Sequence, residues 1–150
     1  MHGGQFYRWV VNGWVHFDDR DRPHEARRLL ALRYHLSAQV AAEYADAGFT
    51  CVAQDNIYGS DVGDWLMAVA PRPRHLVVLR PSVAVVEARD LARTRATGKV
   101  AYGGDYTVAQ NDADVGITPR SIGLWLDTSQ QGPDETVAEI LDRRSEAWVQ

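Results

Sequence analysis

Three short apolar runs, separated by helical patterns, constrain the fold of this chain most. They span residues 49–53 (FTCVA), 75–79 (HLVVL) and 122–126 (IGLWL). Continuous apolar runs of this length are typical of strands that are covered on both faces. Helical patterns accompany them over residues 5–14, 24–47, 61–69 and 83–95, and from Pro133 towards Trp148. This order predicts an α/β fold with a doubly wound parallel sheet.

The longest helical pattern runs from His24 to Ala47. Its apolar side chains recur at intervals of three and four residues, which is the spacing of one helix face. Pro23 suits the first turn of a helix, and Gly48 suits the position just after its end. We therefore expect this segment to form one long amphipathic helix.

Length, charge and cysteine content narrow the class of protein. The 150 residues predict a single domain, and 16 basic against 20 acidic residues give a net charge of −4. A protein that binds nucleic acid through phosphates usually has a basic excess, so a nucleic-acid partner is not expected. No apolar run is long enough to cross a membrane. Cys51 is the only cysteine, which favours a reduced, cytoplasmic setting.

In a doubly wound fold, ligands bind where the parallel strands end. The polar residues that follow the three predicted strands are Asp55 with Asn56, Arg80, and Asp127 with Thr128. The topology predicts that these side chains meet at one edge of the sheet.

Four passages, in this order, resemble small P-loop kinases. They are HGGQFYRWVVNGWV, EYADAGF with the following TCVAQD, HLVVLRPSVAVVEARDLAR, and LWLDTSQQGPDETVAEIL. Together they cover nearly the whole chain. The chain is similar to the chloramphenicol-phosphotransferase-like and zeta-toxin-like members of the P-loop kinase and AAA-type ATPase group.

The resemblance implies a domain of P-loop NTPase kinase type that lacks its first strand, phosphate loop and first helix. The phosphate-binding motif GxxxxGK[ST] is absent, and the nearest string, at residues 97–100 (TGKV), follows a helix and lacks the hydroxyl after lysine. The missing elements are expected ahead of Met1, which makes residues 1–150 one N-terminally incomplete domain. A lid is expected around residues 89–115. Gly3, Gly4 and Gln5 stand where relatives carry the acid that activates the acceptor.

The resemblance also assigns roles to individual residues. Asp55 would hold Mg²⁺, a lid of arginines would stabilise the transferred phosphate, a turn would border adenine, and one arginine would contact substrate. The lid arginines are Arg89, Arg93 and Arg95. The turn at adenine is Asp127 with Thr128, and the arginine at the substrate is Arg8.

Each of these residues also has a structural interpretation. Asp55 could cap a turn, and the lid arginines could pair with Glu87 and Asp90 on a solvated helix. Asp127 and Thr128 could be ordinary turn residues after a strand. Arg8 could be an exposed helical arginine. These alternatives are open at the level of sequence.

The expected function is therefore ATP-dependent phosphoryl transfer to a hydroxyl of a small molecule or antibiotic. ATP and Mg²⁺ would be needed, and both depend on the missing phosphate loop, so this chain is expected to be inactive alone. The alternative is a non-catalytic binding or regulatory module descended from the same fold. A sheet that lacks its central strand would expose unpaired backbone groups, which makes a homo-oligomer possible.

Overall fold

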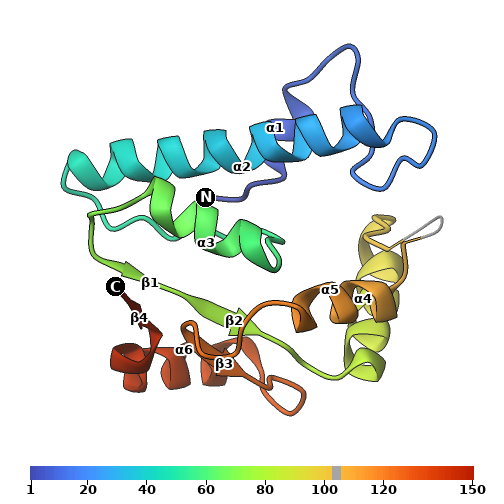
Figure 1. The fold of residues 1–150 in the computed structure, drawn as a ribbon. Coiled ribbons are helices and arrows are strands. Elements are labelled where there is room, and N and C mark those ends of the chain that lie inside the picture. Colours follow the sequence, from blue (N-terminus) through green and yellow to red (C-terminus); the bar gives the residue numbers. More distant parts are fainter. Residues whose placement is uncertain (103–105) are drawn as a thin grey trace. The chain divides into compact units, whose positions relative to one another are not determined.

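The computed structural model describes residues 1–102 and 106–150. The chain packs into two compact units, Met1–Arg72 and Pro73–Gln150, which we call unit 1 and unit 2. Figure 1 labels the α-helices and strands of both. In the described part of the chain, no helix has the combination of length and apolar content that crossing a membrane requires.

Unit 1 is helical. It contains α1 (Gln5–Arg8), α2 (Pro23–Asp46) and α3 (Ser60–Ala68). The long helix predicted from the sequence is confirmed as α2, which begins at Pro23 and is followed by Gly48 in the left-handed conformation with φ of 87°. Glycine adopts this conformation without the steric cost that a Cβ atom adds, so it ends the helix cleanly.

Unit 1 has one buried apolar cluster at Val15, Ala26 and Leu29 and another between α2 and α3. Ala38 and Ala41 of α2 are buried against Val69, and Trp65 of α3 packs on them. The Trp65 indole N–H also donates to the Ser37 hydroxyl at 2.8 Å. Small alanine side chains let the two helices approach, and the buried polar atoms of Trp65 and Ser37 satisfy one another.

Unit 2 contains two small sheets and four helices among its described residues. They are β1 (Arg74–His75), β2 (Val77–Leu79), α4 (Val83–Thr97), α5 (Val108–Gly116), β3 (Leu124–Leu126), α6 (Pro133–Asp142), the 3₁₀ helix η1 (Arg144–Ala147) and β4 (Trp148–Val149). β2 pairs with β3 in parallel, and β1 pairs with β4 in antiparallel fashion. The helices α4 and α5 lie between β2 and β3 in the sequence and contact each other.

The core of unit 2 is built on the parallel pair. Leu124 and Leu126 of β3 are 2% and 3% exposed, and both pack with Ala147 of η1. Val77 of β2 and Ile140 of α6 close this cluster. Alternate residues of β3 therefore face α6 and η1, while Trp125 points to the other face of the pair.

The predicted doubly wound parallel sheet of P-loop kinase type is wrong. The run at 75–79 is divided between the two sheets, and 49–53 forms no strand. Among the described residues, the N-terminal tripeptide alone forms a β-bridge beside this segment, with Gln54 N–H donating to Met1 O at 2.9 Å and Gly3 N–H donating to Gln54 O at 3.0 Å. So short a partner cannot extend a ladder, and Val52 stays 74% exposed.

Two predicted helices are shorter than expected. α1 ends at Arg8 rather than near residue 14. The large apolar side chains between these positions are largely exposed, Val11 to 97%, so no burial stabilises a longer helix. α6 ends at Asp142, and the chain then turns through η1 into β4. The apolar spacing alone did not reveal that the last residues pair with Arg74 and His75.

Gly123 and Gly98 form a matched pair for a test of the parallel pairing. Both have positive φ, 72° and 69°, but a Cβ atom on Gly123 would lie 2.6 Å from the Leu76 carbonyl oxygen, whereas one on Gly98 meets nothing within 4 Å. We expect G123A to lower the free energy of unfolding by about 1–3 kcal/mol more than G98A, because overpacking adds to the shared backbone strain. Urea denaturation measures the difference. Equal losses would show that β2 and β3 do not approach as closely as described.

Candidate functional site

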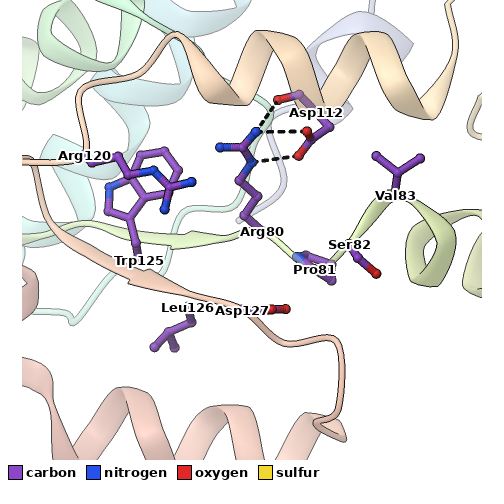
Figure 2. Close-up of a pocket in the computed structure, with 9 residues that line it drawn as sticks. All are labelled: Arg80, Pro81, Ser82, Val83, Asp112, Arg120, Trp125, Leu126 and Asp127. Atoms are coloured by element: carbon purple, nitrogen blue, oxygen red, sulfur yellow. Dashed lines mark hydrogen bonds and ion pairs between the residues drawn. The ribbon is translucent and has the colours of Figure 1, made fainter.

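A pocket of about 270 Å³ lies where β2 and β3 end. Its polar and aromatic lining comes from the ends of both strands, from the start of α4, from α5 and from the segment before β3. These residues are Arg80, Ser82, Asp112, Arg120, Trp125 and Asp127. Figure 2 shows all nine residues that line it. Although the large sheet is absent, the pocket forms at the carboxyl ends of parallel strands, as in larger α/β folds.

Arg80 lines the pocket because it directly follows β2, where β2 ends beside β3. Its backbone N–H donates to Leu126 O at 2.8 Å and continues the parallel pairing by one residue. Its guanidinium donates to Asp112 through Nε at 2.7 Å and Nη2 at 2.9 Å, and Nη2 also reaches the Asp112 carbonyl oxygen at 3.3 Å. These hydrogen bonds lower the pKa of the Asp112 carboxyl, so that Asp112 is charged at neutral pH.

Arg120 and Trp125 lie on the side of Arg80 that faces away from Asp112 (Figure 2). The Arg120 guanidinium carbon is 4.9 Å from the centre of the Trp125 ring, a cation–π contact. The indole N–H of Trp125 donates to Ile122 O at 3.1 Å, which fixes the ring. Among the described residues, no carboxylate forms an ion pair with Arg120. Although its charge acts on Asp112 and helps to lower the pKa of that carboxyl, its N–H donors are left for a ligand.

The turn after β3 holds the start of α4 in place. Asp127 accepts a hydrogen bond from Ser129 N–H at 2.9 Å, and the Ser129 hydroxyl accepts one from Ser82 N–H at 2.8 Å. Bonding to Ser129 also lowers the pKa of the Asp127 carboxyl. Thr128 is buried, with 4% of its surface exposed. In this structure, the two residues predicted to border adenine connect β3 to the first turn of α4.

The three predicted phosphate-stabilising arginines have different surroundings. Arg89 Nη2 donates to Thr128 O at 2.8 Å and to Gln131 O at 3.0 Å, so it fastens α4 to the turn after β3. Arg93 pairs with Asp90 on its own helix, and Arg95 is exposed. None of the three lines the pocket. Residues 103–105 of the predicted lid lie outside the described residues, and a catalytic role for the arginines stays a prediction.

Asp55, the predicted magnesium ligand, lies in unit 1. Its side chain is 5% exposed and forms an ion pair with Arg33, whose side chain is 11% exposed. The Asp55 carboxylate also accepts from Asn56 N–H at 2.8 Å. A Cβ atom on Gly3 would overlap this carboxylate, so glycine is required where the N-terminal segment crosses it. Arg8, the predicted substrate contact, is exposed on α1.

Of the residues that line the pocket, sequence reasoning named only Arg80 and Asp127; the missed residues that carry the argument below are Asp112, Arg120 and Trp125. Asp112 was missed because α5 was not expected, although Thr107 and Gln110 carry the pattern of a capping box, which the structure contains. Trp125 was placed in a strand, but the face to which it points was not assigned. Arg120 had no recognisable signal, because its role depends on the ring beside it.

Comparison of the chain with protein-family models, curated proteins and solved structures gives no match. The resemblance to P-loop kinases therefore has no support beyond the four passages that suggested it. A proposal for the function must therefore be argued from the geometry of the pocket.

The buried Arg33–Asp55 pair gives a prediction for unit 1. D55N leaves the Arg33 charge buried without its partner, and we expect a loss of about 3–5 kcal/mol in the free energy of unfolding. E25Q, which removes a carboxylate from the exposed pair of Glu25 with Arg28, is the control and should cost much less. Both are measured by chemical denaturation.

The same denaturation experiment is repeated in the presence of Mg²⁺. Because the Asp55 carboxylate is already paired, millimolar Mg²⁺ should leave the stability of the wild type unchanged. No group of three or more potential metal ligands occurs among the described residues. A stabilisation by Mg²⁺ that disappears in D55N would contradict this interpretation and restore Asp55 as a metal ligand.

Proposed function

We propose that unit 2 is a binding module for a small molecule that carries an oxyanion group, such as a carboxylate or a phosphate ester. The observation that carries this proposal is the pair of guanidinium groups in one pocket. Arg80 Nη1 and the Arg120 guanidinium have no hydrogen-bond acceptor among the described residues, and Arg80 and Arg120 both line the pocket. Charge-assisted hydrogen bonds from arginine to an oxyanion are roughly twice as strong as hydrogen bonds between neutral groups.

The start of α4 supports the same conclusion. Val83, the first residue of this 15-residue helix, lines the pocket, and no side chain caps the helix start. The first backbone N–H groups of a helix carry partial positive charge and favour an anion nearby. The helix adds to the attraction of the two arginines, which supply the specific contacts.

The size of the pocket limits the ligand. About 270 Å³ corresponds to roughly nine water molecules at about 30 Å³ each. A small organic acid or a short phosphate ester fits this space. The pocket therefore suits a small-molecule binding module, which we propose without descent from the P-loop fold.

The phosphotransferase activity, with ATP, Mg²⁺ and a hydroxyl acceptor, stays a prediction from the four passages. It relied on a sheet that the chain does not form. A cytoplasmic location, inferred from the single cysteine, stays a prediction as well. Neither is needed for the binding function that we propose.

Titration of the full chain with phosphate and with acetate tests the proposal. The chain has five tryptophans, and the indole N–H signal of Trp125 in an NMR spectrum can be assigned with W125F. We expect this signal to shift on titration and the dissociation constant to rise about 10- to 100-fold in R120A, because a hydrogen bond to a charged group contributes about 1.5–3 kcal/mol.

R95A is the matched control, because Arg95 is exposed on α4 and does not line the pocket. It should bind both anions as the wild type does. The proposal fails if neither anion shifts the Trp125 signal, or if R95A weakens binding as much as R120A. Comparison at constant ionic strength is required, since salt screens the attraction of exposed charges.

A further inference from the structure

The hydrogen bonds of Arg80 determine what the pocket can offer to a ligand. A guanidinium has five N–H donors. Asp112 accepts from Nε, and its carboxylate and carbonyl oxygens both accept from Nη2. The donors that are left are the two on Nη1, which points towards Arg120 and Trp125 (Figure 2). A ligand oxyanion at Nη1 therefore lies across the guanidinium from the Asp112 carboxylate.

The position of Asp112 is fixed by the helix that carries it. α5 begins with a capping box in which Thr107 N–H donates to Gln110 Oε1 at 2.6 Å and Gln110 N–H donates to Thr107 Oγ1 at 3.2 Å. At its other end, a Cβ atom on Gly116 would lie 3.1 Å from Arg80 Nη2. Gly116 thus leaves room for the guanidinium beside α5, and the capping box fixes the first turn of the helix that carries Asp112.

The formal charges around a bound oxyanion are nearly balanced. Arg80 and Arg120 attract the oxyanion. Asp112 repels it, because both carboxylate and oxyanion lie beside the Arg80 guanidinium, and Asp127 adds a second carboxylate to the lining. Each additional charge on the ligand increases the attraction and the repulsion alike, so nearly balanced charges leave the larger cost of removing a dianion from water without compensation. A singly charged group is the best match to this field.

We propose that Asp112 is the specificity-determining residue of the pocket and makes it select a small carboxylate monoanion over a dianionic sulfate or phosphate. This inference rests on the proposed function, since it concerns the same site. It narrows the ligand from oxyanions in general to small carboxylic acids. Asp112 acts by its negative charge and by occupying the Nε and Nη2 donors of Arg80, which a ligand then cannot use. Arg80 and Arg120 make the contacts with the ligand.

Acetate and sulfate are the probes for this test, used at constant ionic strength with the Trp125 indole signal as readout. The wild type is expected to bind acetate more tightly than sulfate. D112N removes the charge with little change of shape, and we expect sulfate affinity to rise roughly 100-fold and acetate affinity about tenfold, as the loss of a repulsion that scales with ligand charge implies. The preference then moves towards sulfate by about tenfold.

D114N is the matched control. It makes the same change of charge on the same helix, but residues two apart on a helix face different ways, and Asp114 accepts from the Tyr106 hydroxyl at 2.7 Å instead of lining the pocket. It should leave the ratio of the two dissociation constants unchanged. A thermal unfolding curve for each variant shows that the chain is folded.

The outcomes separate the two proposals. If the wild type binds neither anion, the proposed function fails. If the wild type binds sulfate more tightly than acetate, or if D112N and D114N change the ratio equally, the binding function stands and the role of Asp112 is overturned. The wild-type comparison alone decides the question if D112N does not fold.

Discussion

The parallel pairing of β2 with β3 is the constraint on which unit 2 depends. Each strand has only three residues, and the ladder is continued at its ends by Leu124 N–H donating to Leu76 O at 2.9 Å and Arg80 N–H donating to Leu126 O at 2.8 Å. The pairing buries Leu124 and Leu126 on one face and leaves Trp125 on the other. It also brings Arg80 and Asp127, which are far apart in sequence, to one edge.

Local patterns predicted the helices better than the sheet. Residues 24–47, 61–69 and 83–95 form α2, α3 and α4 nearly as expected, because helical spacing and end signals are properties of a contiguous segment. A strand forms only with a partner strand, and an apolar run does not indicate which segment that partner is. Among the described residues, the run at 49–53 has no strand partner beyond the N-terminal tripeptide, and the run at 75–79 has partners on two different strands.

The same distinction applies to the site. Topology placed Arg80 and Asp127 at the ends of strands, and both line the pocket, because that argument needs only the local strand–turn–helix order. The roles taken from the resemblance required a fold that the chain does not adopt. Asp112 could be recognised only in the structure, since it bonds to Arg80, which is 32 residues away in the sequence. Arg120 lies near Trp125 in the sequence, but no motif marks the position of its guanidinium over that ring.

Leu76 belongs to neither sheet yet joins them. Its N–H donates to Ala147 O at 2.8 Å, beside the β1–β4 pair, and its carbonyl oxygen accepts from Leu124 N–H, beside the β2–β3 pair. The peptide groups of one residue therefore link the segment before β4 to the strands that carry Arg80 and Trp125. Loss of either hydrogen bond would therefore separate the C-terminal pairing from the pair of strands that ends at the pocket.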